Sequence, residues 1–267
     1  MKDILSEIVE HKRADLVQQL SKRCSMADAL RNSRSGIIAE FKRKSPSKGW
    51  IHPDIEPEQV VPLYARYGAC AASILTNEEY FGGHPDFIPR IRKALAGGEP
   101  FFPLLRKEFI ISPYQVYEAK FLGADAILLI AADLSKQEYA ELLGLAHQLQ
   151  LEVLLEVHDP AELEYLESGI PDMLGVNNRS LGTFHTDVQH SFDIAACMQE
   201  AVRKWAPGGG DAHRLPVLVS ESGISNPETV KALRKVGFRG FLIGECFMKE
   251  DNPGEALSRF IQAVEAS

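Results

Sequence analysis

Residues 37–49 read Ile-Ile-Ala-Glu-Phe-Lys-Arg-Lys-Ser-Pro-Ser-Lys-Gly, which begins as a strand and ends as a charged loop containing proline. Alternate residues of a strand share a face. Ile38, Glu40 and Lys42 therefore point one way, and the residues between them point the other way. The two opposite charges could be a structural ion pair at a strand end. A buried ion pair is a poor source of stability, however, so a functional role is the second interpretation.

The same kind of strand recurs along the chain. Short apolar runs lie near residues 36–41, 71–75, 101–107, 126–131, 151–157, 173–177, 216–220 and 240–244. The segments between them have helical patterns, and several begin with a cap residue followed three positions later by Glu or Gln. These predicted caps are Ser112, Ser135, Asp159, Ser225 and Asn252. Glycines that fit a left-handed helix end follow at Gly68, Gly97, Gly123, Gly169 and Gly237.

Eight strand–helix units predict an α/β protein. The chain has 267 residues, close to the roughly 250 of a closed (β/α)8 (TIM) barrel. We therefore expect one domain over 1–267, with a helical extension at 1–34, a barrel at 35–267 and a flexible insert at 207–214. Two smaller domains or an open doubly wound sheet are the alternatives, although no G-x-G-x-x-G motif follows the first strand.

Composition excludes several classes of protein. The formal net charge is −8 and basic residues are scattered, so nucleic acid is not an expected partner. The four cysteines are far apart, which indicates neither a disulfide framework nor a zinc site. The N-terminal pattern is interrupted by charges, and the longest apolar run, 126–132, is too short for a bilayer. We expect a cytoplasmic protein without a membrane partner.

Charged side chains are predicted at the carboxyl ends of the strands, where barrels place their active sites. Each one alone could be a solvated strand end or a surface residue. Together they lie on a consistent face and predict an acid–base site whose charges shift one another's pKa values. The set is Glu40, Lys42, Lys107, Glu156, Asn177 and Glu221. Nearby Phe81, Phe109 and Leu128 would suit a flat aromatic ligand, or they could be ordinary core residues.

The last two strands are followed by glycine-containing turns that open helices. A backbone without Cβ can approach an anion at a helix N-terminus, and barrels often hold phosphate at these loops. The predicted phosphate-binding residues are Ser222, Gly223, Leu242, Ile243, Gly244 and Glu245. Histidines add little: His158 is expected to face away from the site, and His185 and His190 are poorly spaced for a metal. We predict no metal site.

Seven stretches of the chain together resemble the indole-3-glycerol phosphate synthase family. They are Ile38–Ser47, Leu75–Gly83, Arg106–Phe109, Leu155–His158, Gly175–Arg179, Ser220–Ile224 and Leu242–Glu245. The first of these is highly specific, whereas the last two also occur in related phosphate-binding barrels. The resemblance spans nearly the whole chain, including the N-terminal helical segment.

The resemblance implies that 1-(2-carboxyphenylamino)-1-deoxyribulose 5-phosphate closes to indole-3-glycerol phosphate with loss of carbon dioxide and water. It implies that Lys107 is the general acid and Glu156 the base, with Glu40 and Lys42 assisting. The polar residues that would position the ribulose hydroxyls are Asn177, Glu221 and Ser222. Lys42 and Arg179 would meet the substrate carboxylate, and the further expected substrate contacts are Ser45, Pro46 and Leu181. No cofactor or metal is implied, and we expect a monomer.

Three departures from the family pattern stand out. Glu108 replaces an Asp and should face away from Lys107, Glu245 stands where many relatives have a small hydroxyl residue, and the insert at 207–215 is long. The rival enzymes are phosphoribosylanthranilate isomerase, the tryptophan synthase α subunit and a Schiff-base aldolase that uses Lys107 covalently. A barrel that serves only as a scaffold is the non-enzymatic alternative.

Overall fold

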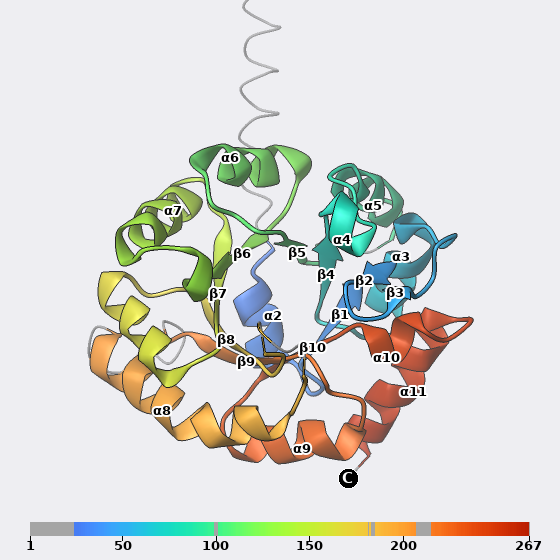
Figure 1. Cartoon of the computed structure of the whole chain (residues 1–267). Helices are drawn as coiled ribbons and strands as arrows, with labels where there is room; N and C mark the ends of the chain where they lie inside the picture. Colours follow the sequence, from blue (N-terminus) through green and yellow to red (C-terminus); the bar gives the residue numbers. More distant parts are fainter. Residues whose placement is uncertain (1–23, 99–100, 181, 183–184, 207–214, 267) are drawn as a thin grey trace, which may run out of the picture.

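The structure is a computed structural model that describes residues 24–98, 101–180, 182, 185–206 and 215–266. Its centre is a closed barrel of parallel strands, each paired with two neighbours, with helices around the outside (Figure 1). This arrangement confirms the predicted (β/α)8 barrel and rules out the open sheet. The predicted helix over 3–31 and the insert at 207–214 fall largely or wholly outside the described residues.

All eight predicted strands are present and form the barrel. They are β1 (Ile37–Phe41), β4 (Ala71–Leu75), β5 (Leu104–Lys107), β6 (Ala126–Ile130), β7 (Glu152–Val157), β8 (Met173–Asn177), β9 (Val217–Glu221) and β10 (Gly240–Ile243). The predicted start of β5 was three residues too early. Phe101 is exposed, and Pro103 has no N–H to give to a neighbouring strand, so regular pairing begins at Leu104.

Helices alternate with these strands. They are α3 (Pro57–Arg66), α4 (Glu78–Phe81), α5 (Phe87–Leu95), α6 (Pro113–Leu122), α7 (Lys136–Gln148), α8 (Gln189–Trp205), α9 (Pro227–Lys235), α10 (Glu245–Met248) and α11 (Pro253–Glu265). Two short 3-10 segments are η1 (Ala131–Asp133) and η2 (Pro160–Ser168). The helix predicted after Asp159 is thus a 3-10 helix.

The predicted helix ends are mostly confirmed, with three exceptions. Ser135 makes the full capping box with Glu138, but the cap of α9 is Asn226 instead of Ser225. Gly123 ends α6 in the left-handed conformation. Gly97 has no positive φ, and Gly169 adopts φ 157° and ψ 149°, outside the left-handed helical region.

A short helix closes the amino end of the barrel. This helix, α2 (Met26–Asn32), buries Met26, Ala27 and Leu30, and in Figure 1 it lies at the centre of the ring of strands. Its apolar side chains pack with the inward residues of the strands, such as Ile38 and Leu105, in one core cluster. A second, larger cluster lies between the strands and the outer helices. The barrel interior is therefore solid at this end.

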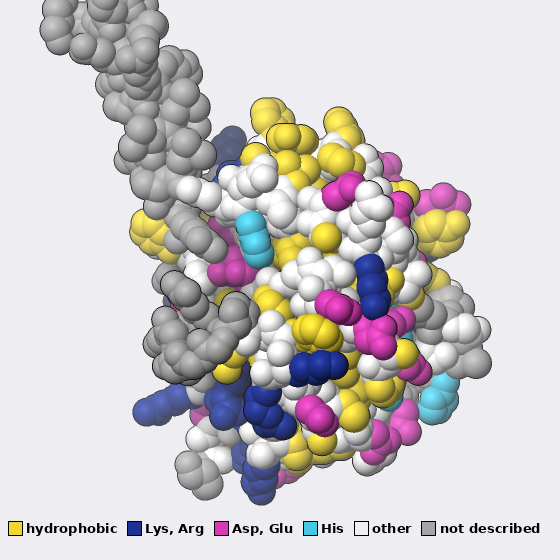
Figure 2. Space-filling view, turned by 90° about the vertical axis from the view of Figure 1, so that its left-hand side faces the viewer, with side chains coloured by type: hydrophobic (Ala, Val, Ile, Leu, Met, Phe, Trp, Pro, Cys, Tyr) yellow, Lys and Arg dark blue, Asp and Glu magenta, His cyan; other side chains and the backbone are white. Residues whose placement is uncertain are grey.

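The strand register places the inward-facing charged side chains at the carboxyl end of the barrel. Asn177 lies beside Glu221, Ile130 beside Glu156, and Leu75 beside Lys107 across neighbouring strands. The first βα loop adds a small hairpin of β2 (Lys44–Ser45) and β3 (Gly49–Trp50) at the same end. Over one outer face, in contrast, Lys, Arg, Asp and Glu side chains are intermixed (Figure 2).

Candidate active site

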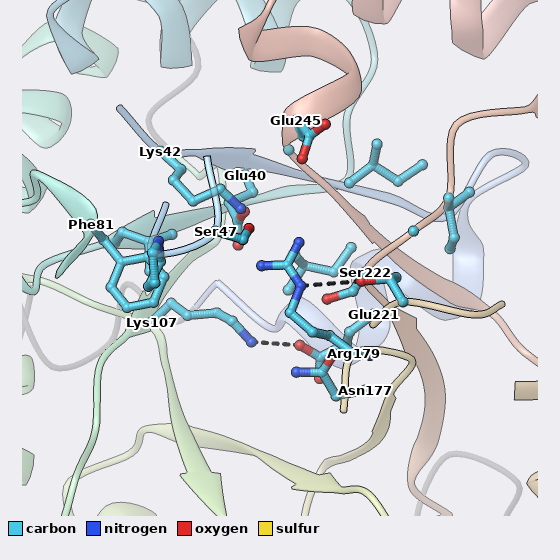
Figure 3. A pocket seen from close by; sticks show the side chains of 18 of the residues that line it. Glu40, Lys42, Ser47, Phe81, Lys107, Asn177, Arg179, Glu221, Ser222 and Glu245 are labelled. Carbon is cyan, nitrogen blue, oxygen red and sulfur yellow. Dashed lines mark hydrogen bonds and ion pairs between the residues drawn. The ribbon is translucent and has the colours of Figure 1, made fainter. Parts of the chain in front are cut away.

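A cavity of about 550 Å³ opens at the carboxyl ends of the strands. This size suits a small organic molecule. Its wall includes most of the residues that the sequence singled out, and Figure 3 shows several of them converging from different strands. The predicted residues in the wall are Glu40, Lys42, Pro46, Phe81, Lys107, Phe109, Leu128, Glu156, Asn177, Arg179, Glu221, Ser222, Gly223, Leu242, Ile243, Gly244 and Glu245.

Lys107 lies between two carboxyl groups. Its Nζ is 2.8 Å from Glu156 Oε2 and 2.5 Å from Glu221 Oε2. Asn177 donates its side-chain amide to the other Glu156 oxygen at 3.0 Å. These side chains come from β5, β7, β8 and β9, so the closed barrel is what brings them together.

The pKa values of these groups diverge because the charges are buried together. Burial alone would lower the pKa of Lys107, but Glu156, Glu221 and Glu40 raise it well above its usual range. Burial raises the pKa of Glu221 to about 8, because it outweighs the lowering by Lys107, and the nearby Glu156 raises it further. For Glu156, Lys107 and Asn177 outweigh burial and lower the pKa. Two carboxyls sharing one ammonium thus behave as one ionised and one largely protonated group.

Glu40 and Lys42 form the ion pair expected at the end of β1. Glycines make room for the carboxyl groups in this wall. A Cβ on Gly244 would lie 2.5 Å from Glu40 Oε1, and one on Gly175 would lie 2.3 Å from Glu221 Oε1. Glycine is therefore required at both positions by close approach of a carboxylate.

The loop after β9 has an uncommon backbone. Ser222 has φ 68° and Gly223 has φ 77°, and a non-glycine residue in this region is characteristic of functional loops. Asn178, which the sequence analysis did not single out, holds the loop by donating to Ser222 O at 3.0 Å and Ser220 Oγ at 3.2 Å. Its Oδ1 accepts from Ser191 Oγ at 2.7 Å. The adjacent Asn177–Asn178 pair was the available signal for this residue.

Glu245 lines the cavity, and its carboxylate is paired. Lys48 Nζ, from the hairpin loop, lies 2.5 Å from Glu245 Oε1. Burial alone would raise the pKa of Glu245, but Lys48, with Lys42 and Arg179, lowers it. Lys48 was not among the predicted site residues, because it belongs to a loop whose path cannot be predicted from periodicity.

Aromatic and aliphatic side chains form the other wall. The rings of Phe81 and Phe109 have centroids 6.4 Å apart, and Leu128 lies deeper. Glu108 makes no contact with Lys107 among the described ion pairs, and it accepts instead from Thr76 Oγ1 at 2.7 Å. Glu108 lines the cavity without pairing with Lys107, which agrees with the expectation that its side chain faces away from that lysine.

Two predicted substrate contacts are not among the described residues of this wall. Ser45 is buried in the β2–β3 hairpin, and its hydroxyl has no hydrogen-bond partner among the described residues. Leu181 lies outside the described residues.

His158 was expected to face away from the site. It is not among the residues that line the cavity, as expected, but its Nε2 lies 3.4 Å from Glu156 Oε1. The strand ends at Val157, so strict alternation no longer fixes the direction of the next side chain.

Metal and membrane features are absent from the part of the chain that is described. No group of three or more His, Cys, Asp or Glu side chains there is placed to hold a metal ion. None of the helices described is long and apolar enough to cross a membrane.

A closed barrel with paired lysines and carboxylates in a cavity at the carboxyl ends of its strands defines a (β/α)8-barrel enzyme with an acid–base site. The family model for indole-3-glycerol phosphate synthase matches residues 2–260. The chain therefore belongs to the indole-3-glycerol phosphate synthase family of carboxy-lyases, as the sequence stretches indicated.

Individual relatives agree with this assignment. The indole-3-glycerol phosphate synthase of Bacteroides thetaiotaomicron is 50% identical, covering 99% of this chain and 100% of the relative. The enzymes of that name from Carboxydothermus hydrogenoformans and Magnetococcus marinus are 38% and 42% identical, covering 96% and 89% of this chain and 89% and 82% of theirs. A solved 3-hexulose-6-phosphate synthase shares the fold, with a TM-score of 0.62 at 12% identity, over 86% of this chain and 99% of that one.

Proposed function

We propose that this protein closes 1-(2-carboxyphenylamino)-1-deoxyribulose 5-phosphate to indole-3-glycerol phosphate, releasing carbon dioxide and water. The observation that carries the proposal is the position of Lys107, an ammonium group held between Glu156 and Glu221 in the cavity wall. Ring closure needs a positioned proton donor at the ketone and a base later in the reaction. This trio supplies both.

In this proposal Lys107 protonates the ketone oxygen as the aromatic carbon attacks it. The raised pKa of Lys107 keeps the side chain charged, and the proton moves only when the oxygen becomes a strongly basic alkoxide. Loss of carbon dioxide then restores the aromatic ring. Lys42, with Arg179, would hold the departing carboxylate.

Glu156 is the base for the dehydration that follows. Its lowered pKa leaves it ionised and ready to accept a proton, whereas the raised pKa of Glu221 makes that group a hydrogen-bond donor toward a ribulose hydroxyl. Glu40 assists through Lys42, and Asn177 orients Glu156. The aromatic ring of the substrate would lie against Phe81, Phe109 and Leu128.

The phosphate would lie at the loops after β9 and β10. Ser222, Gly223 and the 242–245 turn line this part of the cavity, with Lys48 and Lys249 close by. These cations offset the Glu245 carboxylate, which the Lys48 ion pair already partly neutralises. A cytoplasmic monomer that functions as a single domain, without nucleic acid, metal or cofactor, remains a prediction from the sequence.

The test mixes purified protein with the carboxyphenylamino-deoxyribulose phosphate, without added metal, and follows indole fluorescence. Wild-type protein should give a rising signal, and Lys107→Ala should abolish turnover while it leaves folding and phosphate affinity nearly unchanged. Lys136→Ala is the matched control, because Lys136 pairs with Glu164 on the surface of α7.

Three results would contradict the proposal. A folded wild type that binds the substrate without turnover favours the scaffold alternative. Near-normal turnover of Lys107→Ala removes the acid role of that lysine. A covalent adduct trapped by borohydride on Lys107 favours a Schiff-base aldolase.

A further inference from the structure

His158 is a buried imidazole with no hydrogen bond through its ring. Both ring nitrogens are shielded from solvent, and neither has a hydrogen-bond partner among the described residues. An unsatisfied buried polar group destabilises a fold, so its presence calls for an explanation. The nearest charged atom is Glu156 Oε1, at 3.4 Å from Nε2.

Several titratable groups surround His158. Glu156 faces it from β7, and Asp133 in η1 is close enough for the charges of Glu156 and His158 to shift its pKa. Glu162 in η2 accepts the backbone N–H of His158 at 2.6 Å. From α8, a ring nitrogen of His190 lies 2.9 Å from the His158 carbonyl. The one lysine of this group, Lys107, lies on the other Glu156 oxygen.

The position of His158 excludes two simpler roles. It does not belong to the cavity wall, so it does not touch the substrate. It is also a poor proton relay, because Nδ1 has no partner among the described residues to which a proton could pass. What remains is an action through Glu156, whose Oε1 it approaches from the side opposite Lys107.

We propose that His158 is a positioning residue for Glu156: its ring Nε2 faces Oε1 and holds the carboxyl group aligned toward the substrate. Glu156 is then held by Lys107 on one oxygen and by Asn177 and His158 on the other. The role in catalysis rests on the proposed function, but the contact between the two side chains does not.

The first test compares kcat and KM in wild type, His158→Ala and His158→Gln. A glutamine amide can still donate to Oε1, whereas alanine cannot. His158→Ala should lower kcat several-fold with KM nearly unchanged, and His158→Gln should recover most of the loss. His147→Ala is the control, because His147 Nε2 also lies beside a carboxylate, 3.0 Å from Asp172 Oδ2, but away from the site. A His158→Ala protein with the kcat of wild type, or a His158→Gln protein that loses as much as His158→Ala, overturns the proposal.

The second test needs no turnover and separates this proposal from the proposed function. NMR compares the ring-nitrogen resonances of each histidine in wild type and in Glu156→Gln at one pH. Replacing the Glu156 carboxylate should shift the Nε2 resonance of His158, and it should leave that of His147 in place. An unchanged His158 resonance overturns the contact, whatever the outcome of the activity assay.

Discussion

Two glutamates on β7 face the barrel interior from opposite ends of the same strand. Glu152 is at the amino end and Glu156 is at the carboxyl end, and each is 3% exposed. The side chains differ only in what surrounds them. Comparing them separates the part of the barrel that supports the fold from the part that does chemistry.

Among the described residues, Glu152 accepts hydrogen bonds from neutral donors. It accepts from Ser25 Oγ at 2.6 Å and from the backbone N–H groups of Met26 and Ala27 at 2.7 and 3.0 Å. These are the otherwise unpaired donors at the start of α2. Burial raises the pKa of Glu152, and the hydrogen bonds only partly offset this. Glu152 therefore fixes the helix that closes the amino end.

Glu156 has charged partners and competitors instead. It shares Lys107 with Glu221, whose Oε1 is buried without a hydrogen-bond partner among the described residues. Such a cluster stabilises the fold poorly, since two carboxyls compete for one ammonium. The carboxyl end thus retains an unsatisfied polar group at Glu221, whereas Glu152 at the amino end is hydrogen-bonded. Unsatisfied groups of this kind are the ones that a reaction can use.

The largest expected effect is on catalysis. Glu156→Gln should lower kcat by about 10²–10⁴-fold, because it removes the proposed general base. The thermal midpoint should change little, since the variant also removes a buried charge. Steady-state indole fluorescence and thermal unfolding measure the two quantities. A Glu156→Gln protein that turns over normally but unfolds early would show that this glutamate supports the fold, as Glu152 does.

The matching change at the other end should affect stability alone. Glu152→Ala leaves the Ser25 hydroxyl and two backbone N–H groups of α2 without an acceptor, at a cost of about 2–4 kcal/mol. For a protein of this size, that lowers the Tm by about 10 °C. The kcat at 25 °C should equal that of wild type. Loss of kcat in a fully folded Glu152→Ala protein would mean that the two ends are coupled.

A variant of Glu221 tests whether repulsion between like charges at the carboxyl end lowers the stability of the fold. A carboxyl whose pKa is raised in the folded state stabilises the fold below its ordinary pKa and loses that contribution as pH rises through the folded value. Glu221→Gln cannot ionise, so its stability advantage should grow from about pH 4 to pH 8 and reach about 1–2 kcal/mol. Denaturant unfolding at several pH values measures it. A difference that shrinks as pH rises contradicts the assigned direction.

The fold was predictable because barrel strands carry local signals. Apolar runs of five to seven residues located all eight strands, and the strand-end positions of Lys107, Glu156 and Glu221 correctly placed them in one cavity wall. Spacing alone could not reveal contacts made by loops. The Lys48–Glu245 pair spans 197 residues, and His158 turns back toward Glu156 only because the strand has ended. The burial of Ser45 likewise depends on a hairpin that local sequence did not indicate.

The N-cap of α9 is another contact that the local sequence pattern did not predict correctly, and it gives the last prediction. Ser225 and Asn226 are adjacent candidates, and the sequence pattern favoured Ser225 because Glu228 follows three residues later. In the structure the Asn226 side chain accepts the Glu228 N–H at 3.0 Å. Asn226→Ala should therefore cost about 1 kcal/mol, or about 2–4 °C in Tm.

Ser225→Ala is the matched control and should leave the Tm unchanged. Both residues lie at the carboxyl end of the barrel. The two variants therefore test whether a polar residue there can stabilise the fold without taking part in the reaction. Equal losses of stability in the two variants would show that the two side chains share the cap. A loss of kcat in Asn226→Ala at unchanged Tm would instead place Asn226 with Glu156, and the division between supporting and reacting residues would then lie within one loop.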